Sequence, residues 1–168
     1  MRQDLYESAM SASNYLEFTK HFRTGCTICS LSEHEGNYPV LYRGNPKARI
    51  MLIGEAPGLR ERELGKPFTG PAGQLLDRMM SAIDINTNED LLITNITYCR
   101  PVASKNSGRQ NYTPKTTQIS RCWPFTRKAI NLINPNIIIA CGLPAAKTIL
   151  EDDKLRMGDI EGHWMDGY

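Results

Sequence analysis

Four cysteines have the type and the spacing that a metal centre requires. Cys26 and Cys29 form a C-x-x-C pair, and Cys99 and Cys122 belong to two later segments of the chain. Four thiolates brought together from separate loops can close a tetrahedral site, and this ligand set serves zinc and a [4Fe–4S] cluster equally. The pair follows a predicted helix and enters a loop. A thioredoxin-type pair would follow a strand and open a helix, so redox chemistry is not expected.

The fifth cysteine, Cys141, follows four apolar residues at the end of a predicted strand, and we expect it to be a core residue. The alternative to a metal centre is that all five cysteines are unrelated free thiols in a reducing compartment. The spacing of the cysteines by itself leaves both interpretations open.

A second candidate site begins at residues 54–58, which read Gly-Glu-Ala-Pro-Gly and directly follow an apolar run. Such a turn exposes backbone amides that can hold a phosphate or a planar ligand close to the main chain. It has neither the Walker A sequence nor the Rossmann glycine spacing, and alone it is a plain strand-to-helix connection. Phe68 lies in a loop of Gly and Pro, where an aromatic ring is either a core residue or a stacking surface. Asn95 ends a predicted strand, where its amide can donate and accept.

Apolar patterning predicts the elements that position these residues. Strands are expected over residues 49–53, 91–94 and 136–140, helices over 4–22 and 143–150 and from Pro71 and Pro114, and a hairpin in the tail around Trp164. Strands that alternate with helices predict an α/β fold with a mainly parallel sheet. Ligands in such sheets bind beyond the carboxyl ends of the strands, which brings residues 54–58, Asn95 and residues 141–142 around one crevice.

Charge is distributed unevenly along the chain. Residues 91–150 contain eight Lys or Arg and no Asp or Glu, and the rest of the chain has 12 basic and 18 acidic residues. A one-sided basic surface suits contact with nucleic acid, and the alternative is a solvated face without a partner. The length of 168 residues suits one domain, residues 1–168. No apolar run is long enough for a bilayer and the N-terminus does not resemble a secretory signal, so a cytoplasmic or nucleoid location is expected.

Five motifs occur together in one order: residues 54–58, 65–68 (Gly-Lys-Pro-Phe), 73–76 (Gly-Gln-Leu-Leu), 93–101 (Ile-Thr-Asn-Ile-Thr-Tyr-Cys-Arg-Pro) and 135–139 (Pro-Asn-Ile-Ile-Ile). With the C-x-x-C pair, this set closely resembles the family 4 uracil-DNA glycosylases, which are [4Fe–4S] proteins of bacteria, archaea and some phages. The likeness runs from about Gly25 to Trp164. It implies a three-layer αβα domain with a central, mainly parallel, four-stranded sheet, and uracil-containing DNA as the substrate.

The resemblance also implies a role for individual residues. The cluster ligands would be Cys26, Cys29, Cys99 and Cys122; the catalytic residues would be Glu55 and Ala56; and the residues around the base would be Gly54, Pro57, Gly58, Phe68 and Asn95. In these roles Phe68 stacks on the extruded uracil, and Asn95 reads the edge of the base. Glu55 holds a water or stabilises the cationic sugar, and amides near Ala56 stabilise the departing anion.

The match departs from the family at two places. Family members continue into a strand and a His-Pro-Ser segment whose His donates to uracil, whereas this sequence ends at Tyr168, and His163 does not fit that motif. In addition, 22 residues separate Cys99 from Cys122, more than is usual, and the extra loop at 102–113 is expected to touch DNA or a protein.

Two hypotheses for function follow from these departures. If the natural chain continues into the His-Pro-Ser segment, we expect an active glycosylase that initiates base-excision repair. If it does not, we expect weak or absent catalysis in a module that binds DNA or a replication or repair protein. A monomer without membrane attachment is expected in both cases.

Overall fold

A four-stranded sheet forms the centre of the computed structural model, with the strand order β1-β3-β2-β4. The strands are β1 (Arg43–Gly44), β2 (Ile50–Gly54), β3 (Leu91–Asn95) and β4 (Ile137–Ala140). Strand β2 pairs in parallel with both β3 and β4, and only the short β1 runs antiparallel, on the outer edge of β3. The structure describes residues 2–22, 25–34, 36–102 and 112–166.

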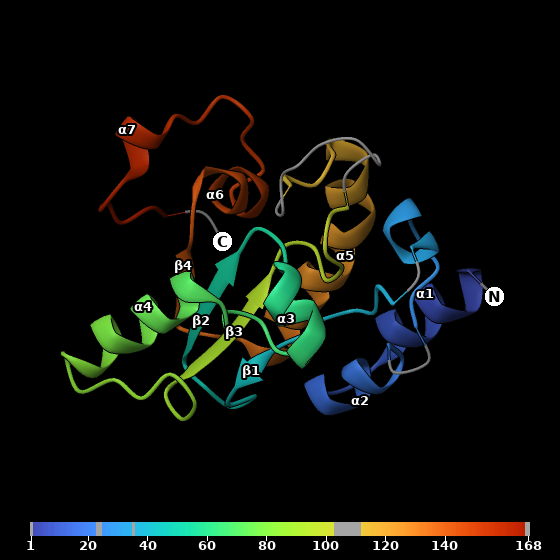
Figure 1. The fold of residues 1–168 in the computed structure, drawn as a ribbon, viewed down its shortest axis with the longest axis horizontal. Coiled ribbons are helices and arrows are strands. Elements are labelled where there is room, and N and C mark those ends of the chain that lie inside the picture. Colours follow the sequence, from blue (N-terminus) through green and yellow to red (C-terminus); the bar gives the residue numbers. More distant parts are fainter. Residues whose placement is uncertain (1, 23–24, 35, 103–111, 167–168) are drawn as a thin grey trace.

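Helices cover both faces of the sheet (Figure 1). They are α1 (Arg2–Ser11), α2 (Tyr15–Lys20), α3 (Leu59–Leu64), α4 (Pro71–Ser81), α5 (Thr116–Ile133), α6 (Leu143–Ile149) and α7 (Met157–Ile160), with a 3-10 helix, η1, at Ser30–Glu33. No helix in the described part of the chain combines the length and the apolar character that a bilayer crossing needs.

Alternate residues of each strand face different helices, because side chains along a strand point to opposite faces. Met51 and Ile53 of β2 pack into a large core with side chains of α1, α2, α5 and α6. Leu52, between them, belongs to a smaller core under α4, with Leu91 and Ile93 of β3. This arrangement confirms the predicted three-layer αβα fold with a mainly parallel four-stranded sheet.

The single helix predicted over residues 4–22 is wrong, because the chain breaks between α1 and α2. Asn14 is the N-cap of α2, and its side-chain oxygen accepts a hydrogen bond of 2.9 Å from the Glu17 amide. The Glu17 carboxylate in turn accepts from the amide of Ser13 at 2.9 Å. These bonds satisfy amides that a new helix leaves without partners, so they favour a fresh start over a continuous helix.

Two further predictions differ from the structure, and it contains elements that were not predicted. Helix α3 and strand β1 were not predicted, and the helix expected from Pro114 begins at Thr116. The hairpin predicted around Trp164 is wrong within the described residues. The short helix α7 and an irregular stretch through residue 166 occupy that part of the tail, and Trp164 is 85% exposed. Gly162 has a φ of +73°, a turn conformation that the glycines in this segment permit without strand pairing.

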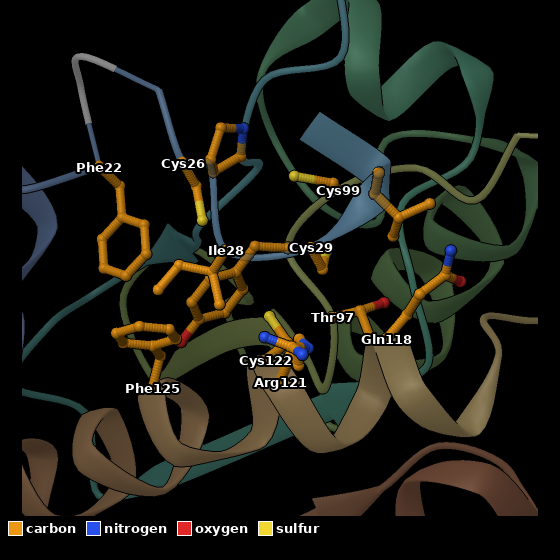
Figure 2. A pocket seen from close by; sticks show the side chains of 13 residues that line it. Phe22, Cys26, Ile28, Cys29, Thr97, Cys99, Gln118, Arg121, Cys122 and Phe125 are labelled. Carbon is orange, nitrogen blue, oxygen red and sulfur yellow. The ribbon is translucent and has the colours of Figure 1, made fainter. Parts of the chain in front are cut away.

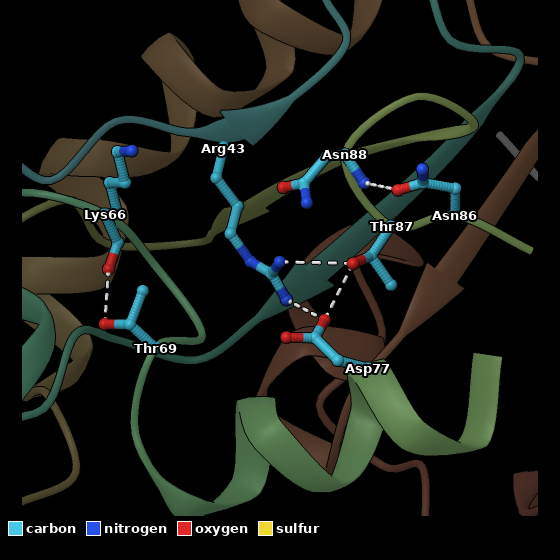
Figure 3. Close-up of polar contacts among 7 residues, drawn as sticks. All are labelled: Arg43, Lys66, Thr69, Asp77, Asn86, Thr87 and Asn88. Carbon is cyan, nitrogen blue, oxygen red and sulfur yellow. Dashed lines mark hydrogen bonds and ion pairs between the residues drawn. The ribbon is translucent and has the colours of Figure 1, made fainter. Parts of the chain in front are cut away.

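Helix α4 is set by a polar network on its flank toward β1. The Arg43 guanidinium contacts the Asp77 carboxylate at 2.6 Å and donates to the Thr87 hydroxyl at 3.2 Å, and that hydroxyl donates to Asp77 at 2.7 Å (Figure 3). Because this flank of α4 faces β1, the side chains on its other flank are exposed to solvent. Met79 and Ile83, which the helical spacing assigns to an apolar face, are 60% and 63% exposed.

Candidate functional site

The four predicted ligand cysteines line one cavity, and we call Cys26, Cys29, Cys99 and Cys122 the cysteine site. Figure 2 shows their side chains around a common space, supplied by the loop after α2, the stretch after β3, and helix α5. The structure therefore brings together residues that lie up to 96 positions apart in the sequence. Cys141 is not part of this group: it is half-buried against the smaller core, as predicted.

Burial and mutual proximity govern the thiols. Burial raises the pKa of Cys99, and the nearby charges of Cys26 and Cys29 raise it further. Burial also raises the pKa of Cys122 well above its ordinary value, with a further contribution from Cys99. Thiolates in an apolar cavity repel one another, and this repulsion favours the protonated form. A bound cation stabilises the thiolates instead, so it would lower the pKa values that burial raises.

The donor set fits a soft metal or an iron–sulfur centre. The cavity wall is otherwise mainly apolar, and Arg121 adds a positive charge that suits a site made of thiolates. No three Cys, His, Asp or Glu side chains in the described ranges already stand in metal-binding geometry. The four cysteines thus gather around one cavity, and ligation by all four remains a prediction.

Two side chains hold the cysteine-bearing segments together. Asn37, which is buried, donates to the carbonyls of Leu31 at 2.7 Å and Arg100 at 2.9 Å, and accepts from the Arg100 amide at 3.2 Å. It therefore ties the segment after Cys29 to the residue after Cys99. Sequence reasoning missed Asn37, because its partners in the fold are 6 and 63 positions away.

Gln118 provides the equivalent link for α5. Its amide oxygen accepts from the Lys115 amide at 2.9 Å, and its amide nitrogen donates to the Ser30 hydroxyl at 3.3 Å. The first turn of α5, one turn before Cys122, is thereby joined to the residue after Cys29. Sequence reasoning missed Gln118, because Lys115 has no side-chain acceptor and Lys-x-x-Gln does not match the capping-box signature.

A second group of predicted residues meets at the carboxyl ends of β2 and β3. We call Gly54, Glu55, Phe68 and Asn95 the glycine-loop site. Gly54 is paired with Asn95 in the sheet register. A Cβ on Gly54 would lie 2.6 Å from both Asn95 Oδ1 and Phe68 Cζ, so the amide and the ring converge over the bare face of this glycine.

The Phe68 backbone is held in an unusual conformation. Its φ is 54°, in the left-handed region that residues other than glycine seldom adopt. Gly73 makes this possible, since a Cβ there would lie only 1.7 Å from the Phe68 carbonyl oxygen. The Thr69 hydroxyl closes the turn by donating to the Lys66 carbonyl at 3.1 Å (Figure 3). Strain of this kind is often found where a side chain must be aimed at a ligand.

The remaining residues of the loop after β2 are Glu55, Ala56, Pro57 and Gly58. Glu55 Oε1 is buried and has no hydrogen-bond partner among the described residues, which is costly unless a ligand or water supplies one. Ala56 follows it and is half-buried, and Pro57 is buried. Glu61, one turn into α3, accepts from the Gly58 amide and so anchors the end of the loop.

A family model described as the uracil DNA glycosylase superfamily matches residues 41–167. The chain belongs to this superfamily. Its glycine-loop site, which includes both the ring and the amide, lies wholly within the matched residues, and so do Cys99 and Cys122. Cys26 and Cys29 precede the match, so the likeness of the cysteine pair depends on individual relatives.

Three relatives of this uracil-DNA glycosylase superfamily member are each named Type-4 uracil-DNA glycosylase. The protein from Pyrobaculum aerophilum is 36% identical over 145 residues, which are 84% of this chain and 69% of the relative. The Saccharolobus solfataricus protein is 38% identical over 135 residues, 80% of this chain and 59% of the relative. The Thermotoga maritima protein is 33% identical over 145 residues, 84% of this chain and 71% of the relative. These matches confirm the resemblance to family 4, and the chain spans between 59% and 71% of the length of these relatives.

Two further predictions concern the tail and the loop of this superfamily member. His163 lies in the exposed stretch after α7, where its Nδ1 contacts the Glu161 carbonyl at 2.9 Å. Most of the loop predicted at 102–113 to touch DNA or a protein, residues 103–111, lies outside the described residues.

Proposed function

We propose that this protein removes uracil from DNA by hydrolysing the N-glycosidic bond of an extruded deoxyuridine. The observation that carries the proposal is the convergence of Phe68 and Asn95 over the bare face of Gly54. A site that recognises a pyrimidine needs two groups, an aromatic ring that stacks on the face of the base and a carboxamide that forms hydrogen bonds with its edge.

Recognition follows from these two side chains. Extruding a nucleotide costs a few kcal/mol of stacking and pairing. Stacking on Phe68 returns about 1–3 kcal/mol of this. A fixed Asn95 amide donates to uracil O4 and accepts from N3–H, while cytosine presents the opposite pattern and leaves buried polar groups unpaired.

The chemical step uses the loop that follows β2. Water adds to the sugar C1′ as the C1′–N1 bond breaks, and the electron pair of that bond leaves with uracil. The water gives up one proton, and uracil gains one, so the products are free uracil and an abasic site. The buried Oε1 of Glu55 holds the water or stabilises the cationic sugar, and amides near Ala56 stabilise the anion.

The cysteine site would hold a [4Fe–4S] cluster, with zinc as the alternative. A bound cluster would supply a covalent cross-link between three segments that Asn37 and Gln118 also join through hydrogen bonds. The protein's partner in this proposal is uracil-containing DNA, contacted as a monomer by the basic stretch over residues 91–150.

The test is an end-labelled oligonucleotide with one uracil, treated with alkali after incubation. We expect strand scission with the wild-type protein and a loss of about 100-fold or more in Phe68→Ala and Asn95→Ala. Salt-sensitive DNA binding without an abasic product would instead support a module that has no glycosylase activity. Iron and sulfide in the purified protein would support the cluster, and zinc without iron would contradict it.

A further inference from the structure

The cysteine site and the glycine-loop site share one continuous piece of backbone. Asn95 ends β3, and Cys99 follows four residues later. This stretch is buried throughout, from Asn95 to Cys99. It is also bonded to the Glu55 loop, because the Ile96 amide donates to the Gly54 carbonyl at 2.9 Å. One buried, hydrogen-bonded segment therefore joins the two sites.

Thr97 lies in the middle of this stretch and touches both sites. It lines the cavity of the cysteine site, where Figure 2 shows it near Gln118, and it is 1% exposed. Its hydroxyl donates to the Glu55 carbonyl at 3.0 Å, and its amide donates to the same oxygen at 3.2 Å. Thr97, which lines the cysteine site, thus forms two hydrogen bonds to the backbone of the loop that carries Glu55.

Thr126 makes a second connection through helix α5. It lies four residues after Cys122, on the same face of the helix, and is completely buried. Its hydroxyl lies 3.4 Å from the carbonyl oxygens of both Asn95 and Ile96. The helix that supplies one thiol therefore also contacts the backbone of the residue that reads the base.

We propose that Thr97 and Thr126 are positioning residues that couple the two sites, so that filling the cysteine site orders Glu55 and Asn95, and filling the glycine-loop site stabilises the cysteine site. The inference rests on the proposed function and deepens it. Coupling between two binding sites is reciprocal, because each ligand changes the affinity for the other by the same factor. Uracil must therefore raise the affinity of the cysteine site for its cluster, just as a bound cluster promotes binding of uracil, and we expect to see this as slower loss of iron.

The matched control is Thr94, which lies in β3 just before Asn95. It is as buried as Thr126, and its hydroxyl donates to the Leu41 carbonyl, toward β1 and away from both sites. Replacing Thr by Val removes a hydroxyl and keeps the shape in all three variants. Thr94→Val and the two test variants thus lose one buried hydrogen-bonding group each, and only the test variants lose a link between the sites.

The first measurement is uracil release by variants that carry the wild-type iron content. We expect Thr97→Val and Thr126→Val to lower kcat by roughly tenfold, as small misplacements of reacting groups do, with little change in KM. Thr97→Ser and Thr126→Ser keep the hydroxyl and should restore the rate. Equal losses of kcat in Thr94→Val and the test variants would overturn the proposal, because loss of stability would then explain them.

The second measurement does not depend on activity. Iron loss to a ferrous-iron chelator is followed by absorbance with and without saturating free uracil. Uracil should slow the loss several-fold in the wild type and in Thr94→Val, and much less in Thr97→Val and Thr126→Val. Equal protection in all variants would overturn the coupling through these threonines. A wild type without iron or without uracil release would contradict the proposed function itself, so the two failures are distinguishable.

Discussion

The cysteine site and the glycine-loop site are built in opposite ways. The cysteine site gathers side chains from distant segments, which Asn37 holds by hydrogen bonds to backbone groups and Gln118 holds by a hydrogen bond to the Ser30 hydroxyl. The glycine-loop site depends on what is missing, because Gly54 and Gly73 leave room that a single Cβ would fill. The cysteine site should therefore be sensitive to the loss of these polar contacts, and the glycine-loop site should be sensitive to added volume.

The largest effect should come from adding one methyl group at Gly54. In Gly54→Ala the new Cβ lies 2.6 Å from the Asn95 amide oxygen and from the Phe68 ring, so one or both must move. We expect uracil release to fall by at least about 100-fold. The protein should still contain iron, because its four thiols are unchanged, but uracil should no longer slow the loss of that iron, since the disturbed loop is bonded to the stretch that carries Thr97. Unchanged uracil release would contradict the roles given to the Phe68 ring and the Asn95 amide.

The next effect should come from removing one thiol of the cysteine site. Cys122→Ser keeps the size of the side chain and replaces a soft ligand by a hard one, so we expect most of the iron to be lost and unfolding to occur at a lower temperature. Cys141→Ser is the matched control, since Cys141 is also half-buried but packs against the smaller core. Equal iron loss in both variants would contradict the assignment of the ligands. Metal analysis and thermal unfolding measure both quantities.

Much of this contrast was visible in the sequence, for a physical reason. The runs that became β2, β3 and β4 are short and mainly apolar, and β2 and β3 end in residues of a different type, Gly54 and Asn95. The four candidate ligand cysteines were also found in the sequence, but only the resemblance to family 4 assigned them to one cluster. Local signals of this kind do not depend on the rest of the fold, so they survive in the structure.

The features that the sequence did not reveal depend on distant partners or on weak periodicity. Helix α3 reads Leu-Arg-Glu-Arg-Glu-Leu, which has no apolar face to detect. The exposure of Met79 could not be foreseen, because the apolar spacing of α4 does not say which flank Arg43 and Asp77 turn toward the sheet. The threonines that join the two sites look like ordinary core residues until their bonds to carbonyls about 30 to 40 positions away are known.

A smaller effect is expected from cutting the polar contacts around the cysteine site. Asn37→Ala removes the three hydrogen bonds that join the Leu31 carbonyl to the backbone of Arg100, at a cost of roughly 2–4 kcal/mol. Iron loss to a chelator should also become faster. The control is Asn45→Ala, since Asn45 bonds the Glu89 carbonyl on the surface and should cost less than about 1 kcal/mol. Urea denaturation separates the two, and equal midpoints would contradict the role of Asn37.

The smallest effect is expected far from both sites, at the break between α1 and α2. Asn14→Ala removes the side chain that caps α2, which typically costs about 1 kcal/mol. Asn14→Asp keeps an acceptor at the same position and should retain nearly all the stability. Neither change should alter uracil release, because α2 packs on the large core and supplies no residue of either site. If Asn14→Ala slowed the reaction while its iron content stayed normal, the glycine-loop site would depend on the N-terminal helices, and its construction from glycines and β-strand ends would be an incomplete account.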